Sequence, residues 1–495
     1  MVVDKGFTIL LLNLPSPRGQ TLWRDAAGGF GASISHSGDY RTDGDTPLHP
    51  FLPYASSVLL EAGYEFKVVD GQRHSAENDQ ILKCVEKINP SIIFSIISLP
   101  SMSSDLKILD KIKEALQNVI VVGVGAVCRV IPEEVLLKGK IDILLRNSYP
   151  YCNGMVELIE KLHKLGSLNS VKGISYFEDD HVVHTAELQE LRFDDLPNPN
   201  YDFIPLDGYE NFSGSTGMRI PYVLVIESKG CPFGCVYCPY PLGYGKELTF
   251  RSPTKIANEI EYLHHTRSIN AFAFKGQTFA YSKKHAFEIC DEIIKRKIDV
   301  SWVCESRVDE VNRELLEKMK SAGCKRIHYG VETGDAETLK IAKPGVMLHT
   351  TKKAFNLTRE YGLATQSHVV LGWPDDTYDT LAKTRRFLLE LNPDALNLNF
   401  LTPYPGTKMY EIAQKDSLLL TQDWSNFTSH KVVMKTRNLS ADQLYAIRNK
   451  IVRDFSIFKL EQLLQHIDAK NINKPRTFFN TAKKLMNKAL FPNIE

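Results

Sequence analysis

The sequence predicts an α/β protein with two sheets, each built from strands that alternate with helices. In residues 7–165, strand-like apolar runs alternate with helical stretches, which predicts a doubly wound, Rossmann-like domain. In residues 221–405, six further strand-like runs alternate with helices, which predicts a parallel sheet curved into a partial (β/α)6 barrel. Helical periodicity after residue 440 predicts a helical C-terminal extension.

The first domain opens with a near-continuous apolar run at 7–15, FTILLLNLP, which predicts a buried strand. The stretch 16–46 is rich in Gly, Ser and Asp, so we expect a long loop there, a length that is uncommon unless it serves a function. A helix is expected at 48–64, and further strands at 65–70, 90–98, 119–126 and 141–147. Because ligands of such folds bind beyond the carboxyl ends of the strands, the residues that follow these runs are candidates for binding.

Composition excludes several classes of protein. Lysine and arginine number 60 and aspartate and glutamate 59, so the chain of 495 residues lacks the basic excess expected of a nucleic-acid-coating protein. The N-terminus enters a strand without the features of a secretory signal, and no apolar run approaches the ~20 residues that span a membrane. Six of the nine cysteines are scattered singly, which favours a reduced, cytoplasmic protein over a disulfide framework.

The linker and the tail complete the organisation. Residues 171–185 predict a small hairpin, and the Pro- and Asp-rich stretch 194–209 marks the join between domains. Residues 474–491 carry five basic and no acidic side chains, with apolar positions at helical spacing, so this tail could lie on an anionic inner membrane surface or dock on the protein's own core. We expect a Rossmann-like domain at 1–165, a linker at 166–215, the barrel at 216–412 and a helical region at 413–495.

Strand-like runs of the barrel are expected at 221–228, 271–276, 299–306, 326–332, 364–373 and 395–405. The helix at 253–267 illustrates the intervening elements, because Pro253 stands near its start and apolar residues recur at helical spacing. Binding sites of such barrels lie at the carboxyl ends of the strands.

Three cysteines, Cys231, Cys235 and Cys238, follow the first barrel strand. A structural zinc ion needs four ligands, so a zinc site would require Cys324 or a histidine as a fourth. Iron–sulfur clusters are normally held by four thiolates, so a trio of thiols would leave one iron of a four-iron cluster without a protein ligand. An open iron can bind and reduce a small molecule.

The motif Cys231-Pro-Phe-Gly-Cys235-Val-Tyr-Cys238 resembles that of the radical SAM superfamily. The resemblance implies a [4Fe-4S] cluster on these cysteines that reductively cleaves S-adenosylmethionine (SAM) to a 5′-deoxyadenosyl radical. It also implies a one-electron donor such as flavodoxin or ferredoxin. It singles out no further catalytic residue.

The same resemblance implies SAM contacts at the strand ends. The candidates are Tyr237, Gln277, Ser306, Arg307 and Glu332. The fork of Arg307 suits a carboxylate geometrically. For Ser306, Arg307 and Glu332 the alternative is a helix cap or a surface ion pair. One departure is Lys275, which stands where relatives often have an acidic residue and cannot accept a hydrogen bond.

The order of elements in the first domain resembles the cobalamin-binding domain that precedes the barrel of many radical SAM enzymes. The candidate cobalamin contacts are Asp70, Ser98, Gly123 and Gly125. The chain lacks the Asp-x-His-x-x-Gly motif that supplies a histidine to cobalt, and Arg146–Pro150 replaces an acidic turn. A fold that has lost its cofactor is therefore the alternative.

The resemblance as a whole implies cobalamin-dependent methylation of an unactivated carbon. The alternatives are a radical SAM catalyst of cyclisation, rearrangement or oxidation, and a non-catalytic corrinoid- or metal-binding module. We expect the substrate to be a small molecule or a lipid. No residue set in the sequence marks one class of substrate.

Overall fold

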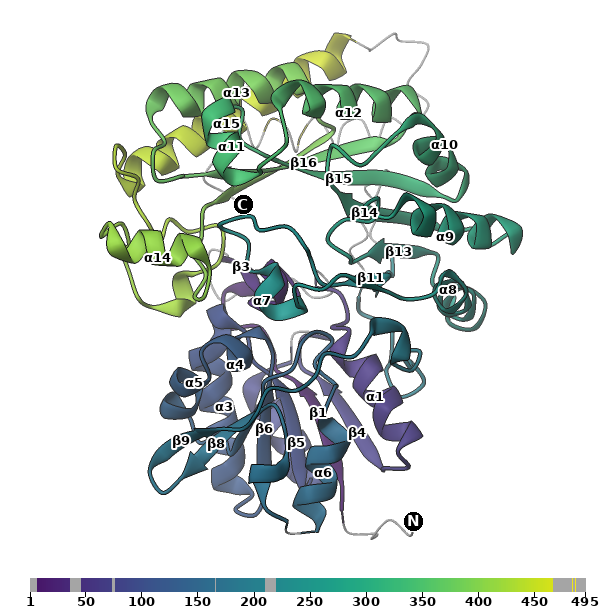
Figure 1. Cartoon of the computed structure of the whole chain (residues 1–495), viewed down its shortest axis with the longest axis vertical. Coiled ribbons are helices and arrows are strands. Elements are labelled where there is room, and N and C mark those ends of the chain that lie inside the picture. Colours follow the sequence, from purple (N-terminus) through teal and green to yellow (C-terminus); the bar gives the residue numbers. More distant parts are fainter. Residues whose placement is uncertain are drawn as a thin grey trace.

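The computed structural model describes residues 7–35, 46–73, 76–164, 166–209 and 220–465, with the single residues 483 and 486. Within these ranges the chain forms two mainly parallel sheets, which lie one above the other with helices around them (Figure 1). The basic tail at 474–491 lies outside the described residues except for Lys483 and Met486.

The first sheet confirms the predicted doubly wound domain. Its order is β4-β1-β5-β6-β7-β8-β9, and the strands from β4 to β7 run parallel. These strands are β1 (Ile9–Asn13), β4 (Phe66–Asp70), β5 (Ile92–Ile96), β6 (Ile120–Val124) and β7 (Ile143–Leu145). β1 and β5 are buried along their whole length, as apolar runs covered on both faces should be. The strand order reverses between β1 and β5, which makes their carboxyl ends the switch point.

Helices cover both faces of this sheet. α1 (Phe51–Glu61) and α6 (Met155–His163) share one core with it. On the opposite face lie α2 (Asn78–Ile88), α3 (Met102–Ala115) and α5 (Pro132–Lys138). The short α4 (Ala126–Val130) follows β6 directly. α2 begins with a capping box between Glu77 and Gln80, which satisfies backbone N–H groups that the helix itself leaves unpaired.

One antiparallel hairpin was not predicted, and a second, predicted hairpin joins the first sheet. The stretch 16–46, expected to be a loop, contains β2 (Gln20–Trp23) paired with β3 (Ala32–Ser35). The hairpin predicted in the linker is present as β8 (Ile174–Glu178) and β9 (His181–His184), but β8 pairs with β7 and extends the first sheet. A local pattern predicts a hairpin, whereas the edge that it joins depends on long-range pairing.

The second sheet confirms the partial barrel. Its order is β10-β13-β14-β15-β16-β17, and every neighbouring pair is parallel. The strands are β10 (Val223–Val225), β13 (Ala271–Phe274), β14 (Ser301–Ser306), β15 (Cys324–Glu332), β16 (Ala364–Leu371) and β17 (Ala395–Phe400). Within the described ranges β10 and β17 do not pair, so the sheet stays open.

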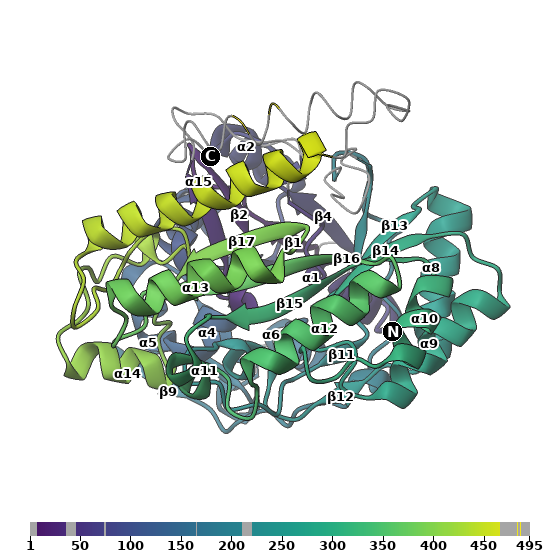
Figure 2. The same ribbon diagram turned by 90° about the horizontal axis from the view of Figure 1, so that it is seen from above.

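Helices cover the outer face of the second sheet (Figure 2). They are α8 (Pro253–Arg267), α9 (Lys283–Lys295), α10 (Arg313–Ser321), α11 (Ala336–Ala342), α12 (Leu348–Glu360) and α13 (Tyr378–Leu391). After α14 (Lys408–Lys415), the predicted C-terminal helix is α15 (Ala441–Gln465), which packs beside α13. Of the helices described, none combines the length and apolar character needed to cross a membrane.

Candidate functional site

The loop that carries the three cysteines begins at a tight pair of strands. β11 (Ser228–Lys229) pairs antiparallel with β12 (Thr249–Phe250), and the loop runs between them. Gly230 has φ +88°, and a Cβ there would lie 1.9 Å from the carbonyl oxygen of Glu247, so only glycine fits. The amide of Cys231 donates to Gly245 O at 3.1 Å, and that of Cys238 to Cys235 O at 3.1 Å.

The short helix α7 (Tyr240–Tyr244) of this loop contacts the first domain. It packs against α4 and against the turn at Ala27–Gly29 that joins β2 to β3. A Cβ on Gly243 would lie 1.9 Å from Gly28 O, so the two backbones touch. Figure 1 shows α7 between the two sheets. The cysteine loop therefore faces the carboxyl edge of the first sheet.

The three thiols lie within electrostatic reach of one another. Burial raises the pKa of Cys231, Cys235 and Cys238, and the neighbouring thiols add to the rise for Cys231 and Cys238. Cys235 and Cys238 remain partly exposed. Metal ligation requires thiolates, so binding iron here would release protons.

The zinc alternative needs a fourth ligand beside the three cysteines in the described part of the chain. There, no group of three or more His, Cys, Asp or Glu side chains converges on a point that could hold one metal ion. Cys324, the proposed fourth ligand, is fully buried at the start of β15, where its thiol points to Arg326 O at 3.7 Å. The assignment of Cys231, Cys235 and Cys238 as ligands of a four-iron cluster stays a prediction.

Arg307 lies beside the cysteine loop but its fork is already engaged. Its guanidinium carbon lies 3.9 Å from the centre of the Phe233 ring. Its Nε and Nη2 donate to the two carboxylate oxygens of Asp309 at 3.0 and 2.8 Å. Arg307 therefore already makes to Asp309 the two hydrogen bonds that we expect it to make to the SAM carboxylate. A ligand would have to share Arg307 with Asp309 or displace Asp309 from it.

Glu332 ends β15 in a strained backbone conformation. Its φ is +65°, a left-handed value that is costly for a residue other than glycine and that clusters at functional sites. The Lys343 ammonium donates to its Oε1 at 3.3 Å and to Gly330 O at 2.9 Å. Glu332, Lys343 and Arg307 all contribute electrostatically to the pKa of Cys235, so the three charged groups lie within electrostatic reach of this thiol.

Tyr237 connects the cysteine loop to Glu332. Burial, together with the nearby Glu332 and the cysteines, raises its pKa well above the usual value. Its ring meets the edge of Trp373 at 5.2 Å between centroids. The structure therefore brings Tyr237, Arg307 and Glu332 together around the thiols.

Ser306 and Gln277 lie at the ends of neighbouring strands and contact different carboxylates. The hydroxyl of Ser306 donates to Glu310 Oε2 at 3.3 Å. Glu310 also accepts from the hydroxyl of Thr278 and from the amide of Arg307. Gln277 Nε2 lies 3.5 Å from Glu305 Oε2. Their assignment as SAM contacts stays a prediction.

The four candidate cobalamin residues all lie at the carboxyl edge of the first sheet. Asp70 accepts from Tyr209 Oη at 2.6 Å, from Asn13 Nδ2 at 2.8 Å and from the amide of Gln72 at 2.9 Å. A Cβ on Gly125 would lie 2.5 Å from Ile97 O. Ser98 and Gly123 are buried at the ends of β5 and β6.

The chain fills part of the switch-point crevice with its own ion pair. Arg24, from the β2–β3 hairpin, donates to Asp105 at 2.7 and 2.8 Å and to Leu14 O at 3.0 Å. Both side chains of the pair are fully buried. Arg24 Nη1 also lies 3.5 Å from Ser98 Oγ, so it bridges the ends of β1 and β5.

Unpaired polar atoms remain at the same edge. Asn13 Oδ1, Ser95 Oγ and His49 Nε2 are buried, and none finds a hydrogen-bond partner in the described ranges. His49 Nδ1 accepts from the amide of Phe51 at 3.1 Å, so the neutral ring carries its proton on Nε2. Burial lowers the pKa of His49 to about 4. Buried polar atoms without partners are uncommon and point to a missing water or ligand.

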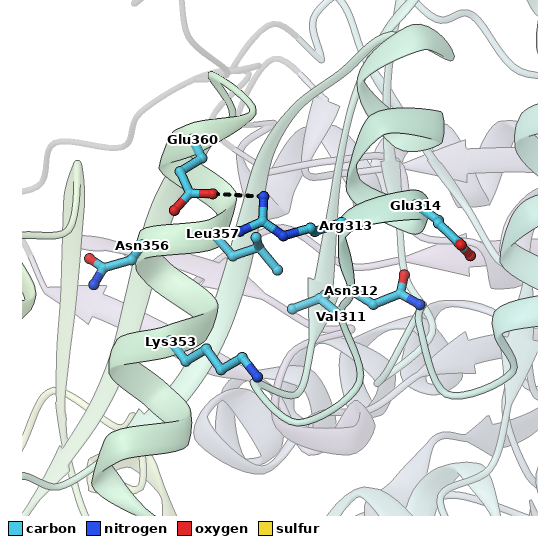
Figure 3. Close-up of a pocket in the computed structure, with 8 residues that line it drawn as sticks. All are labelled: Val311, Asn312, Arg313, Glu314, Lys353, Asn356, Leu357 and Glu360. Atoms are coloured by element: carbon cyan, nitrogen blue, oxygen red, sulfur yellow. Dashed lines mark ion pairs between the residues drawn. The ribbon is translucent and has the colours of Figure 1, made fainter.

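A separate groove opens in the outer helical layer. It lies between α10 and α12, with a volume of about 710 Å³, and the ion pair between Arg313 and Glu360 at 3.1 Å spans it (Figure 3). Val311 and Leu357 are its apolar residues. Because it lies between helices outside the sheet, it is distinct from the strand ends that carry the candidate site.

Sequence reasoning missed several residues of the site. Lys343 carries no motif in the sequence, and Asp25 lies in the stretch 16–46, which was expected to be a loop. Glu227 is 1% exposed and accepts from the amide of Gly276 at 2.9 Å, where a Cβ would lie 2.0 Å from Glu227 Oε1. The glycine at 276 was the available signal, since it allows this close approach.

Comparisons with known proteins agree with this architecture. Residues 225–388 match the model of the Radical SAM superfamily. An uncharacterized methyltransferase of Pyrococcus horikoshii is 28% identical over 406 residues, 82% of this chain and 86% of that protein. The anaerobic magnesium-protoporphyrin IX monomethyl ester cyclase of Cereibacter sphaeroides is 24% identical over 438 residues, 87% of this chain and 70% of the cyclase.

A solved structure has the same fold. The radical S-adenosylmethionine methyltransferase TsrM from Kitasatospora setae superposes with a TM-score of 0.67 at 15% identity, over 97% of this chain and 99% of that one. This likeness confirms the predicted order of an α/β domain followed by a partial barrel.

Proposed function

We propose that this radical SAM protein is a methyltransferase that uses cobalamin to place a methyl group on an unactivated carbon of its substrate. One observation carries the proposal: α7 of the cysteine loop is seated on the first domain, so the three thiols and the carboxyl edge of the first sheet share one junction. The P. horikoshii relative is named a methyltransferase, and the TsrM structure is described with cobalamin and a [4Fe-4S] cluster bound.

Cys231, Cys235 and Cys238 would hold the iron–sulfur cluster. They fit it because the three thiols lie within electrostatic reach of one another, two of them are partly exposed, and Cys324 points elsewhere. When bound, such a cluster supplies the electron that cleaves SAM at its sulfonium. A cluster held by this loop would face the carboxyl ends of the barrel strands, which carry the polar groups described above.

Charged groups around Cys235 would bind the methionine part of SAM. Glu332 offers a carboxylate for the amino group, and Lys343 and Arg307 offer cations for the carboxylate. Tyr237 and Trp373 form an aromatic corner beside them, suited to stacking against a flat ring. Ser306 and Gln277 add hydrogen-bonding groups at the adjacent strand ends.

The carboxyl edge of the first sheet would hold cobalamin, whose bound form supplies the methyl group. Its fit rests on the buried, unpaired Asn13 Oδ1, Ser95 Oγ and His49 Nε2, which a ligand with many amide groups could satisfy. Gly125 allows close approach of the backbone there. His49 would act as a hydrogen-bond donor and not as a metal ligand, because its protonated Nε2 has no free lone pair.

A second candidate is radical chemistry without methyl transfer, such as cyclisation, rearrangement or oxidation. The buried pair of Arg24 and Asp105 favours it, since the pair occupies part of the crevice in which ligands of such folds bind. The relative from C. sphaeroides is named a cyclase. The two candidates share the cluster and the SAM site and differ in the fate of the methyl group.

Partners and location follow from the same chemistry. We propose a small-molecule substrate, a one-electron donor such as flavodoxin or ferredoxin, and a cytoplasmic setting, which suits a chain in which none of the nine cysteines forms a disulfide. The basic tail at 474–491 would touch anionic membranes. Liposome flotation of the chain with and without residues 474–495 tests this contact, and equal flotation of both forms would remove it.

The experiment for the main proposal is anaerobic reconstitution with iron, sulfide and hydroxocobalamin. After desalting, the proposal predicts cluster absorbance together with cobalt near one atom per chain. With SAM labelled in its methyl group, label should pass to a product. Cluster and SAM cleavage without cobalt or labelled product would favour the second candidate. Metal bound without SAM cleavage would leave only a non-catalytic module.

A further inference from the structure

The inner face of three neighbouring barrel strands is polar. Along β15 and β16, residues buried against the helices alternate with partly exposed residues. Successive side chains of a strand point to opposite faces, so the partly exposed set faces the inside of the barrel. This set includes Arg326 and His328 on β15, Gln366 and His368 on β16, and Asn397 and Asn399 on β17.

The register of the sheet places five polar side chains side by side. Glu305 of β14 pairs with His328, and His328 pairs with Gln366. One level closer to the carboxyl ends, His368 pairs with Asn397. Paired residues of parallel strands share a face and a level. Glu305, His328, Gln366, His368 and Asn397 therefore form one continuous surface, the polar wall, just below Arg307 and Glu332.

The polar wall has hydrogen-bonding capacity that the protein does not use. Gln366 Nε2 lies 3.3 Å from His368 Nε2, and Asn397 Nδ2 lies 3.3 Å from His368 Nδ1. A neutral imidazole has one donor and one acceptor, so one of these amides must turn its oxygen to the ring. Each amide then keeps further donors or acceptors for a ligand.

His328 adds an unsatisfied group to the polar wall. Its Nε2 is buried and has no hydrogen-bond partner within the described ranges. Its ring lies 5.6 Å from that of His368. Burial lowers the pKa of both imidazoles, which keeps them uncharged at neutral pH. They therefore offer hydrogen bonds and no net charge.

We propose that the substrate is a small polar molecule whose amide, hydroxyl or carboxylate oxygens hydrogen-bond to the polar wall. The inference rests on the proposed radical SAM function and specifies its substrate class. A hydrocarbon lipid in the same place would leave several buried polar groups without partners. Each such group lowers affinity on the order of tenfold, so a site of this kind discriminates strongly against lipids.

The test uses the full chain, reconstituted with its cluster and hydroxocobalamin and then mixed with SAM and dithionite. The rate of 5′-deoxyadenosine release is measured first without substrate and then with two fractions of an extract of the native host. One fraction is soluble in aqueous methanol and the other in chloroform. We expect the aqueous fraction to raise the rate severalfold and the chloroform fraction to leave it unchanged.

Three variants test whether the polar wall is responsible for this stimulation of 5′-deoxyadenosine release. Gln366→Met and His368→Leu remove hydrogen-bonding groups of the polar wall, and each variant should need about ten times more of the aqueous fraction for the same stimulation. Ser367→Ala is the matched control, because Ser367 lies between them on the opposite, buried face of β16. It should respond like the wild type. Iron content and circular dichroism check that each variant is folded.

Two outcomes would overturn the inference. One is stimulation by the chloroform fraction alone or by neither fraction. The other is full stimulation of folded Gln366→Met and His368→Leu by the aqueous fraction. Failure of the proposed function would look different, because the wild type would then release no 5′-deoxyadenosine even when its cluster is present.

Discussion

The ammonium of Lys275 lies 3.0 Å from the carboxylate of Asp25, and this ion pair joins the barrel to the first domain. Lys275 follows β13, where the family resemblance leads us to expect an acidic residue. Asp25 comes from the β2–β3 hairpin, and the side chains are 14% and 7% exposed. An acid is therefore present at this position of the junction, but the other domain supplies it.

Breaking this pair should destabilise the protein. Asp25→Asn leaves the Lys275 charge buried without its partner, which costs about 3–5 kcal/mol. The double variant Asp25→Asn with Lys275→Met removes both charges and should recover most of that loss. Urea unfolding followed by fluorescence measures both. Equal midpoints for the wild type and Asp25→Asn would show that the pair does not hold the domains together.

The same pair predicts a loss of stability in acid. Burial would raise the pKa of Asp25, but Lys275 and then His49 outweigh it and hold the pKa below 3.8. The contribution of Asp25 is therefore present above pH 3.8 and is lost as the pH falls through its lower folded value. The difference in stability between the wild type and Asp25→Asn should shrink over that range. A difference that stays constant down to pH 2 would contradict this.

Cys235→Ala should abolish the cluster. Two thiols cannot hold a four-iron cluster stably, so iron should fall from about four atoms per chain to a small fraction of that. Iron analysis after anaerobic reconstitution measures the loss. Cys84→Ala is the control, because Cys84 is an exposed thiol on α2 far along the chain from the loop. An iron content in Cys235→Ala equal to that of the wild type would refute the assignment of Cys235 as a cluster ligand.

Glu332→Gln should weaken SAM binding. The substitution removes the negative charge that faces the SAM amino group in the proposed site, and hydrogen bonds to charged groups are worth about 1.5–3 kcal/mol, so the Kd should rise roughly tenfold or more. Equilibrium dialysis of the reconstituted protein with SAM measures it. Glu337→Gln, on the exposed side of α11, is the control. An unchanged Kd would remove Glu332 from the site.

Gly243→Ala should loosen the cysteine loop from the first domain. The new Cβ would lie 1.9 Å from Gly28 O, and backbone on both sides must move to relieve the contact. We expect a lower unfolding midpoint and lower iron content per chain. Gly166→Ala is the matched change at an exposed position, where the nearest atom belongs to the flexible Lys161 side chain at 3.3 Å. If the two variants have the same unfolding midpoint and iron content, the contact of α7 with the first domain is not important for cluster binding.

Glu227→Gln should flatten the pH dependence of stability. Burial raises the pKa of Glu227 from 4.5 to about 7, so the folded state holds a proton that the unfolded state has lost between these values. Wild-type stability therefore falls as the pH rises through this window, by a few kcal/mol at most. The glutamine variant lacks this slope and should be the more stable protein at pH 8. Parallel slopes for the two proteins from pH 5 to 8 would contradict the assignment.

The alternation of elements was predictable because local patterns encode it. The strand-like apolar runs predicted both sheets and all six barrel strands, and helical periodicity predicted the helices between them. The cysteine motif predicted which loop would bind the cluster, because the spacing of its cysteines is specific. Gly230 and the close backbone approach beside it show how local sequence also determines the turn of that loop.

The contacts across the junction could not be predicted, because residues far apart in sequence make them. Asp25 and Lys275 are joined only when the two domains pack. Arg24 fills the crevice at β1 and β5 because the β2–β3 hairpin folds back over the sheet, which the composition of 16–46 did not indicate. The polar wall depends on strand register, which sets residues from β14, β15, β16 and β17 side by side.

The most direct test of the central claim is the release of 5′-deoxyadenosine from SAM by the anaerobically reconstituted, reduced protein. If Cys231, Cys235 and Cys238 hold a cluster with an open iron beside the SAM site, the wild type should form 5′-deoxyadenosine and Cys235→Ala should form none above background. A wild-type protein that carries its cluster yet leaves SAM intact, or a Cys235→Ala variant that cleaves SAM at the wild-type rate, would contradict it.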